Sequence, residues 1–281
     1  MAGPLDGRVI FMSGGSRGIG LAIATRAARD GARVALMAKT AEPHPKLPGT
    51  IYTAADEIQA AGGEALPMVG DIRDADAVDT AVAETVERFG GIDIVVNNAS
   101  AINLSPMRDL EVKRFDLMQT INARGTFVVT RACLPHLRQS DHAHVLTLSP
   151  PLSADPRWLQ GHSAYTLSKM GMTMITLGVA TDEAEAGVAA NCLWPRTIIA
   201  TAAVQNLLGG DEAMARSRTP EIVADAAHAI LVRDPRECTG NTFIDDELLA
   251  EEGITDLSGY SAEGAELALD IFVDGWPAAQ R

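Results

Sequence analysis

Two residues with acid–base potential stand four positions apart in the stretch YTLSK, where Tyr165 is followed by Lys169. On a helix, side chains four residues apart project from the same face. A free tyrosine has a pKa of about 10 and transfers protons poorly at neutral pH, but a nearby ammonium favours the phenolate and lowers that pKa. The pair is therefore suited to general acid–base catalysis, with Tyr165 handling the proton and Lys169 tuning it.

A glycine-rich turn, SGGSRGIG, follows the first apolar run of the chain. Gly14, Gly18 and Gly20 would allow a tight turn, close approach of the main chain to a pyrophosphate, and close packing of the next helix on its strand. The helix that follows would offer free N–H groups to the phosphates. Because this turn comes directly after an N-terminal strand, it predicts a dinucleotide site.

The end of the second predicted strand favours NADP(H) over NAD(H). NAD enzymes place an acid about 20 residues past the glycines, whereas NADP enzymes place a cation near the 2′-phosphate. Here the strand ends at Lys39 without an acid, and Arg17 lies in the glycine turn. The loop at 40–49 contains three prolines. It either brings His44 and Lys46 to the same phosphate or is a solvated surface loop.

The elements that must position these residues alternate along the chain. Strands are predicted at 8–13, 32–38, 64–70, 92–98, 144–149, 188–194 and 239–246, and helices at 18–30, 53–63, 74–90, 110–137 and from Ser163. Apolar strands alternating with helices indicate a parallel sheet covered on both faces. We expect a Rossmann-type, doubly wound α/β fold of about seven strands, forming one domain over residues 1–281. Ligands of such folds bind beyond the carboxyl ends of the strands.

Composition narrows the class of protein. The 281 residues are 47% hydrophobic, and no apolar run reaches the roughly 20 residues that span a membrane. The net charge of −14 argues against nucleic acid and anionic membranes as partners. Three cysteines lie far apart, without metal-ligand spacing. We expect a cytoplasmic protein with reduced thiols, no signal peptide and no metal site.

These features, with further motifs, resemble the short-chain dehydrogenase/reductase family along nearly the whole chain. The motifs are GGSRGIG at 14–20, Asp71 in GDI, NNAS at 97–100, Asn122, YTLSK at 165–169 and N-xxx-P at 191–195. The resemblance implies an oxidoreductase that transfers hydride between NADP(H) and a carbonyl/alcohol pair. The implied catalytic residues are Tyr165, Lys169 and Asn122, to which we add Ser149 as the expected carbonyl-binding serine. The implied cofactor-binding residues are Gly14, Ser16, Arg17, Gly18, Ile19, Gly20, Lys39, Asp71, Ile72, Asn98, Ala99, Tyr165, Lys169, Pro195 and Ile198.

The resemblance also implies individual roles. Asp71 would hold the adenine amino group, and Asn98 would brace the central strands. Asn122 would position a water that links Lys169 to solvent, and Ile198 would offer its backbone to the carboxamide. A narrower likeness, carried by residues 39–54, 148–152, 194–197 and the EEG-containing tail, is to the hydroxysteroid dehydrogenase-like branch of the family. In animals that domain precedes a sterol-carrier-like domain, which these 281 residues do not contain, so we expect no lipid-carrier role.

The chain departs from the family pattern at the serine that hydrogen-bonds the substrate carbonyl. The fifth strand ends TLSP, so that Pro150 fills the place of the serine. Proline offers neither a side-chain donor nor an N–H. We expect Ser149 to take over, because it leaves the strand at the carboxyl edge of the sheet. The alternatives are Ser153 and the loss of this hydrogen bond.

Two further departures lie near the expected nicotinamide site. Arg196 follows Pro195 where the family has glycine, which means either a rerouted loop or a new cation that faces the cofactor or a substrate carboxylate. Residues 245–247, Asp-Asp-Glu, replace an Asp-Gly-Gly turn after the last strand. We expect a substrate loop at about 196–218 and a C-terminal extension at about 248–281.

The substrate side is predicted to be apolar. It would comprise Ile102, Leu104, Leu152, Trp158, Trp194 and residues 198–215. These suit a hydrophobic alcohol, aldehyde or ketone, although such residues serve equally as core or lid. We expect a homodimer or homotetramer, formed through the helices after the fourth and fifth strands. An alternative function is that of a catalytically weak NADP(H)-binding regulatory or scaffold protein, which the missing serine would suit.

Overall fold

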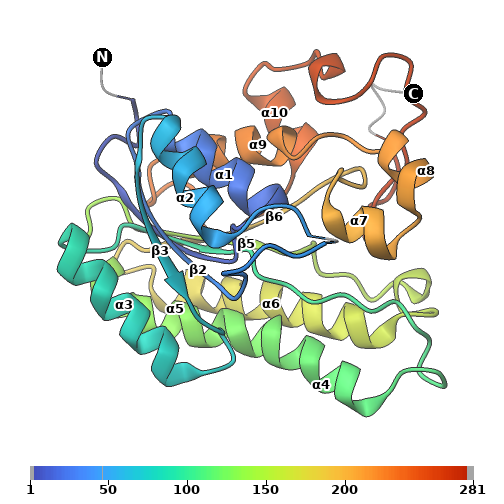
Figure 1. The fold of residues 1–281 in the computed structure, drawn as a ribbon, viewed down its shortest axis with the longest axis horizontal. Helices are drawn as coiled ribbons and strands as arrows, with labels where there is room; N and C mark the ends of the chain where they lie inside the picture. Colours follow the sequence, from blue (N-terminus) through green and yellow to red (C-terminus); the bar gives the residue numbers. More distant parts are fainter. Residues whose placement is uncertain (1–2, 46, 277–281) are drawn as a thin grey trace.

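Seven parallel strands form one sheet in the order β3-β2-β1-β4-β5-β6-β7 (Figure 1). This is a computed structural model, and it describes residues 3–45 and 47–276. The strands are β1 (Val9–Ser13), β2 (Arg33–Ala38), β3 (Glu64–Val69), β4 (Ile94–Asn97), β5 (His144–Leu148), β6 (Ala189–Trp194) and β7 (Thr242–Ile244). The strand order reverses between β1 and β4, and the crevice beyond their carboxyl ends is where this class of fold binds ligands.

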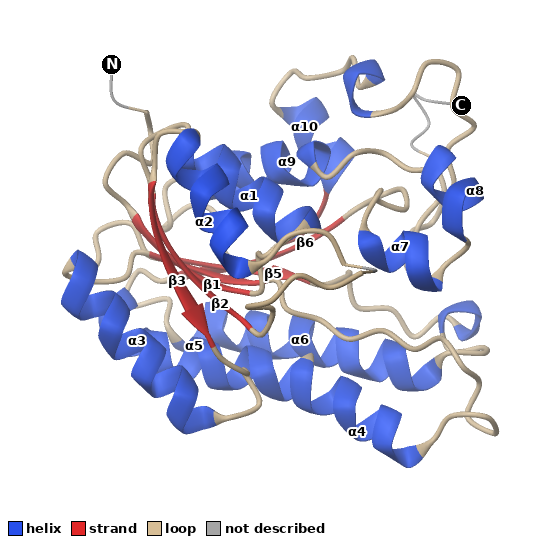
Figure 2. Ribbon diagram, viewed as in Figure 1, coloured by secondary structure: helices blue, strands red, loops and turns tan. Residues whose placement is uncertain are grey.

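Helices cover both faces of the sheet (Figure 2). They are α1 (Gly18–Ala28), α2 (Ile51–Ala60), α3 (Ala75–Phe89), α4 (Val112–Ile121), α5 (Ala123–Leu137), α6 (Ser163–Asp182), α7 (Ala202–Leu207), α8 (Gly210–Ala215), α9 (Glu221–Leu231) and α10 (Asp245–Glu251). On one face α1 packs against α9, and on the other α5 packs against α6. Within the described part of the chain, no helix has the length and apolarity needed to cross a membrane.

The sheet is held between two apolar cores, one under each layer of helices. Every residue of β1, β4, β5 and β6 is buried, which explains why these strands read as continuous apolar runs rather than alternating ones. Ile10, Met12 and Leu36 face one core, and Phe11, Ala35 and Met37 face the other. The predicted doubly wound fold is confirmed.

One predicted element is wrong: the long helix expected at 110–137 is two helices, α4 and α5, that meet at Asn122. Asn122 has a ψ of −80°, outside the helical range near −42°. Its side-chain amide accepts from the N–H of Ala101 (2.7 Å) and donates to the carbonyl of Ala101 (2.9 Å) and to Oγ of Ser168 (2.9 Å). These three bonds tie the helix junction to the loop after β4 and to α6.

The chain after α10 returns to the carboxyl edge of the sheet. Residues 268–273 run beside the loop that leaves β6, with an antiparallel bridge between Leu269 and Thr197. Phe272 and Val273 are buried. Much of the predicted C-terminal extension therefore belongs to the body of the domain.

Candidate active site

The glycine turn forms a cradle that a side chain would fill. A Cβ on Gly14 would lie 2.6 Å from Nδ2 of Asn98, and one on Gly20 would lie 2.4 Å from the same atom. Gly14 also has a φ of +82°, which L side chains avoid. The turn therefore lets the Asn98 amide pack against α1, and Nδ2 donates to the carbonyl of Ser13 (3.4 Å). This agrees with the expected bracing role of Asn98.

The N-terminus of α1 is open toward the cradle. Its N-cap residue, Arg17, makes no side-chain cap to the first turn, so the first N–H groups of the helix are not capped by it and are suited to phosphate. The guanidinium of Arg17 donates instead to the carbonyls of Pro48 and Gly49, each at 3.0 Å. The proline-rich loop at 40–49 thus folds against Arg17, while Lys46 of that loop lies outside the described residues.

A cavity of about 670 Å³ lies at the carboxyl ends of β1 to β4. Ten of the predicted cofactor residues line it: Gly14, Ser16, Arg17, Gly18, Ile19, Lys39, Asp71, Ile72, Asn98 and Ala99. His44, Thr201 and Asn206 also line it. Its size is in the range that holds small ligands and cofactors, and the cradle and the open helix end fit the pyrophosphate of a dinucleotide. Gly20, Tyr165, Lys169, Pro195 and Ile198 are outside its lining.

Charges concentrate at one end of this cavity. Nζ of Lys39 lies 3.3 Å from a carboxylate oxygen of Asp71, and a guanidinium nitrogen of Arg73 lies 2.5 Å from the same oxygen. Hydrogen bonds from Arg73 hold the pKa of Asp71 well below its ordinary value, and Lys39 adds to the effect. Asp71 is therefore a fixed anion that orients Lys39 beside the cavity.

Tyr165 and Lys169 lie on one face of α6 and are both buried, at 5% and 2% exposure. Nζ of Lys169 donates to the carbonyl of Leu148, the last residue of β5, at 2.6 Å. The same ammonium lies 5.0 Å from the centre of the Trp194 ring. Asn122 joins the group through Ser168, whose hydroxyl also donates to the carbonyl of Tyr165 (2.8 Å). The structure thus brings together three of the four predicted catalytic residues.

The electrostatics of the pair differ from expectation. Burial lowers the pKa of Lys169 to about 7. The pKa of Tyr165 is raised rather than lowered, mainly because burial removes the phenol from water and secondarily because the Asp270 carboxylate disfavours a phenolate. The prediction that the pKa of Tyr165 is lowered is therefore wrong.

The fourth predicted catalytic residue, Ser149, is hydrogen-bonded further along α6. It is fully buried, and its hydroxyl is hydrogen-bonded to that of Thr173 at 2.9 Å. Thr173 follows Tyr165 by about two turns of α6. Oγ of Ser153 accepts from the N–H of Asp155 (3.2 Å) and so closes a local turn. Which serine polarises a carbonyl stays a prediction.

Arg196 is held by the chain's own carboxylates. Its side chain is 4% exposed, and Nε donates to Asp246 at 2.9 and 3.0 Å. Other guanidinium nitrogens contact Glu247 and the carbonyl of Gly275. The departures at Arg196 and at 245–247 therefore pair with each other. Of the two interpretations of Arg196, the structure favours the rerouted loop over a cation that faces a ligand.

Sequence reasoning missed Asp270 and Phe272. The Phe272 ring is stacked on Tyr165, with centroids 6.2 Å apart and planes at 25°. It also meets Trp158 at 6.0 Å and Trp194 at 5.8 Å. Desolvation raises the pKa of Asp270 to about 7. The tail carries no periodic pattern that could have predicted its return to the site across more than 70 residues from β6.

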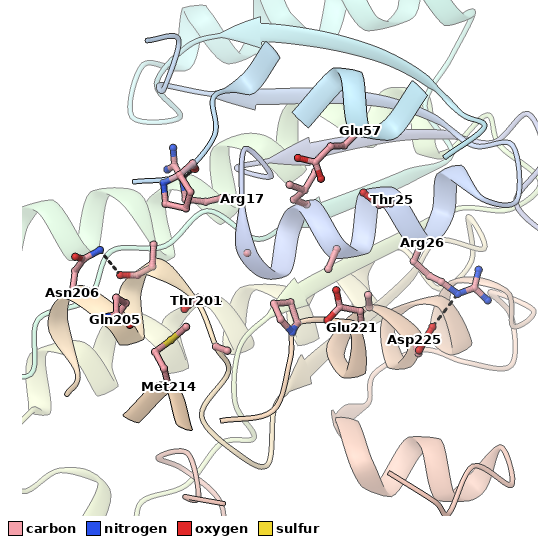
Figure 3. A pocket seen from close by; sticks show the side chains of 18 of the residues that line it. Arg17, Thr25, Arg26, Glu57, Thr201, Gln205, Asn206, Met214, Glu221 and Asp225 are labelled. Atoms are coloured by element: carbon pink, nitrogen blue, oxygen red, sulfur yellow. Dashed lines mark hydrogen bonds and ion pairs between the residues drawn. The ribbon is translucent and has the colours of Figure 1, made fainter. Parts of the chain in front are cut away.

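A second cavity, of about 610 Å³, lies between α1, α7 and α9 (Figure 3). It adjoins the first, since Arg17, Gly18 and Thr201 line both. Arg26, one of the three arginines that line it, is paired within the chain with Asp225 (3.0 Å), and the pair is joined by a dashed line in the figure. Of the predicted catalytic and cofactor-binding residues, only Arg17 and Gly18 line this second cavity, and residues of the predicted substrate side at 198–215 line it as well: Ala200, Thr201, Ala202, Gln205, Asn206 and Met214.

The model of the short chain dehydrogenase family matches residues 8–210. The chain is 52% identical over 278 residues to the hydroxysteroid dehydrogenase-like protein 2 of Xenopus tropicalis, covering 99% of this chain and 66% of that protein. It thus spans slightly less than two thirds of this relative's length. The predicted likeness to the hydroxysteroid dehydrogenase-like branch is confirmed.

Solved structures show the same likeness. A short chain dehydrogenase of Mycobacterium thermoresistibile superposes with a TM-score of 0.91 at 60% identity, covering 96% of each chain. A blue fluorescent protein from a metagenomic library, solved in complex with NADPH, superposes with a TM-score of 0.73 at 26% identity, covering 86% of this chain and 97% of that one.

Proposed function

Since the chain belongs to the short-chain dehydrogenase family, we propose that it is an NADP(H)-dependent oxidoreductase that interconverts a carbonyl and an alcohol on a hydrophobic small molecule. One observation carries this proposal: Tyr165 and Lys169 share a face of α6, beside Asn122 and at the sheet edge that holds the glycine cradle. A bound nicotinamide would supply or accept the hydride.

The chain's own residues would manage the proton. In the reducing direction Tyr165 gives its hydroxyl proton to the carbonyl oxygen, and in the oxidising direction it takes the proton back. Lys169 supplies the positive charge that favours the phenolate when the two groups come together. Asn122 holds the backbone of Ala101 and the Ser168 hydroxyl, and so fixes the helix that carries both residues.

The preference for NADP(H) is supported by cations beside the cavity. Lys39 ends β2 where an NAD enzyme would have an acid, and Arg17 lies in the glycine turn. Charge-assisted contacts from such residues favour a 2′-phosphate. The NADPH complex of the blue fluorescent protein shows that a relative of this fold takes that cofactor.

An apolar substrate is supported by the surroundings of Tyr165. Trp158, Trp194 and Ile102 pack in the same cluster as Tyr165, and the predicted substrate-side residues Leu104 and Leu152 are 36% and 47% exposed. Aromatic and aliphatic walls bind apolar groups by removing their surface from water. We expect hydrophobic aldehydes or ketones to be reduced faster than short polar ones.

A homodimer or homotetramer is proposed through α4, α5 and α6. Each of these helices exposes a large apolar side chain: Val112 at 75%, Phe127 at 51% and Met174 at 65%. Large exposed apolar side chains of this kind mark contact surfaces when they form a patch. Light scattering of the purified chain would measure the mass, and a strictly monomeric protein would refute this part of the proposal.

Replacement of Tyr165 by phenylalanine tests the reaction. Tyr165→Phe should lower turnover of NADPH with a reactive ketone by at least about 100-fold, because the proton donor is lost, while NADPH still binds. The matched control is Tyr52→Phe on α2, where the ring is half exposed, and its turnover should equal that of the wild type. Undiminished turnover in Tyr165→Phe would refute the assigned mechanism.

The covered state of Tyr165 favours the alternative function, that of an NADP(H)-binding protein without turnover. Tyr165 is covered by Phe272, and no serine hydroxyl is hydrogen-bonded to its phenol oxygen in the described part of the chain. Screening a panel of aldehydes, ketones and alcohols with both nicotinamides separates the two functions. Tight cofactor binding with no turnover across the panel would favour the alternative.

A further inference from the structure

Residues 268–273, here called the strap, are hydrogen-bonded along the loop that leaves β6. The N–H of Ile198 donates to the carbonyl of Ala268 (3.1 Å), and the N–H of Asp270 donates to the carbonyl of Arg196 (2.9 Å). Nε1 of Trp194 donates to the carbonyl of Ile271 (2.9 Å). These bonds make the strap a short extra strand beside the loop after β6.

The strap occupies groups that the proposed reaction needs. Ile198 is the residue whose backbone is expected to meet the carboxamide, and both of its main-chain groups are already used. Its N–H is bonded to the strap, and its carbonyl accepts from the N–H of Arg218 (3.1 Å). Tyr165 and Lys169 are likewise absent from the lining of the cofactor cavity. The adenosine end of the site is therefore open, while the nicotinamide end is covered.

Phe272 covers the tyrosine itself. Its ring is stacked on Tyr165 and lies within about 6 Å of the rings of Trp158, Trp194 and His162. Centroid distances of this size are those of packed aromatic pairs. With Phe272 at 5% and Tyr165 at 5% exposure, a substrate cannot reach the phenol without displacing the ring.

The backbone of Phe272 is strained. Its φ of +70° is the one positive φ of a residue other than glycine among the described residues. Bulky residues avoid this region, and such a conformation persists where the surroundings enforce it. The aromatic cluster and the hydrogen bonds of the strap enforce it here. A segment that holds strain while it covers a site has a driving force to open once those contacts are broken.

We propose that the strap is a built-in lid, with Phe272 as a stand-in for the substrate, which must lift before nicotinamide and substrate reach Tyr165. The proposal rests on the proposed function, because it assigns a closed state to the same site. Aromatic or branched apolar substrates would replace the Phe272 ring within the pocket formed by Trp158 and Trp194. Because only open molecules bind the whole cofactor, such a lid multiplies the association constant for NADPH by the fraction of molecules that are open.

Chemical labelling of tyrosine tests the cover directly. Tetranitromethane nitrates exposed tyrosines, and peptide mass spectrometry follows Tyr52, Tyr165 and Tyr260 separately. Phe272→Gly removes the ring and also accepts a positive φ, so its fold should be preserved. We expect nitration of Tyr165 to be at least about tenfold faster in Phe272→Gly than in the wild type, because the local cover is lost. The half-exposed Tyr52 should react at one rate in both.

Leu269→Ala is the matched control, since this side chain of the strap is 38% exposed and its cross-bridge to Thr197 is made by the main chain. It should leave the Tyr165 rate at the wild-type value. Unchanged protection of Tyr165 in Phe272→Gly would overturn the proposal. So would an equal acceleration in Leu269→Ala, because the ring would then have no special role.

Cofactor fragments test whether the strap competes with the nicotinamide end. Calorimetry should find that Phe272→Gly binds NADPH about tenfold more tightly than the wild type, with the affinity for adenosine 2′,5′-bisphosphate unchanged. Equal changes for both ligands, or none for NADPH, would count against the lid. Neither readout requires hydride transfer. A chain that behaves as expected here and yet shows no turnover would refute the proposed function alone.

Discussion

Removal of the charge of Arg196 tests the buried cluster that joins the loop after β6 to α10. Arg196 is 4% exposed and Asp246 is fully buried, and the two are joined by two hydrogen bonds of 2.9 and 3.0 Å. Arg218 contacts the same carboxylate at 3.5 Å. We propose two single substitutions, Arg196→Met, which keeps the aliphatic stem, and Asp246→Asn, which keeps the shape.

The contacts of Arg196 and Asp246 predict which of the two substitutions lowers the free energy of unfolding more. Breaking a buried pair from one side costs about 3–5 kcal/mol, because the remaining charge stays buried and unpaired. In Arg196→Met the Asp246 carboxylate keeps Arg218, so we expect a loss near the lower end, about 3 kcal/mol. In Asp246→Asn both guanidiniums lose this carboxylate, so we expect about 5 kcal/mol. The double variant should lose less than the sum of the two single losses, because both remove the same interaction.

Equilibrium unfolding in urea, followed by tryptophan fluorescence, measures these free energies. Lys113→Met is the control, since Lys113 pairs with Glu111 (3.0 Å) at 73% and 60% exposure, and exposed pairs contribute little. Its midpoint should match the wild type within error. Losses below about 1 kcal/mol in both single variants would show that the cluster behaves like a surface pair. A larger loss in Arg196→Met than in Asp246→Asn would refute the role given to Arg218.

Three further outcomes are expected. Burial lowers the pKa of His144 to about 4 from 6.5, so the unfolded chain binds a proton at a higher pH than the folded chain does. The free energy of unfolding should therefore fall by about 3 kcal/mol as the pH is lowered from 6.5 to 4. In urea titrations, His144→Gln should make this pH dependence shallower. Lys39→Ala should weaken NADPH binding about tenfold and leave NADH binding unchanged; equal weakening of both would contradict contact with the 2′-phosphate. Comparing Ser149→Ala with Ser153→Ala should show a loss of about 100-fold in kcat/KM for the serine that polarises the carbonyl, and no such loss in either variant would mean that neither serves.

The fold could be predicted because its signals are local. Each inner strand is a short apolar run, and helices such as α3 repeat buried apolar residues at helical spacing. The glycine turn is recognisable by its spacing. The absence of side chains at Gly14 and Gly20 makes room for the Asn98 side chain. In the strands and helices, the reason for the residue type lies within the element itself.

The break at Asn122 could not be predicted in the same way. Asparagine is only mildly unfavourable inside a helix, and the flanking residues are helical on both sides. What interrupts the helix is a set of three side-chain bonds to Ala101 and Ser168, 21 and 46 residues away. Tertiary contacts of this kind override local propensity and leave no periodic trace in the sequence.

The pKa of Tyr165 illustrates a different limit. The spacing of Tyr165 and Lys169 correctly predicts that they share a helix face. It does not reveal that Nζ of Lys169 donates a hydrogen bond to the Leu148 carbonyl, or that the C-terminal tail places the Asp270 carboxylate near Tyr165. Spacing fixes which groups can meet, whereas the pKa depends on every charge and every layer of burial around them.

Two of the departures from the family pattern, at Arg196 and at 245–247, form one arrangement with the C-terminal tail. An arginine in place of glycine after Pro195 would be a buried charge without a partner, and Asp246 and Glu247 supply the partners where the family has glycines. The same guanidinium also donates to the carbonyl of Gly275, three residues after Phe272. The cluster therefore anchors the far end of the strap, while Trp194 and Ile198 hold its near side. A small residue at position 196 would leave the tail without this anchor, so the charge cluster helps to hold Phe272 over Tyr165.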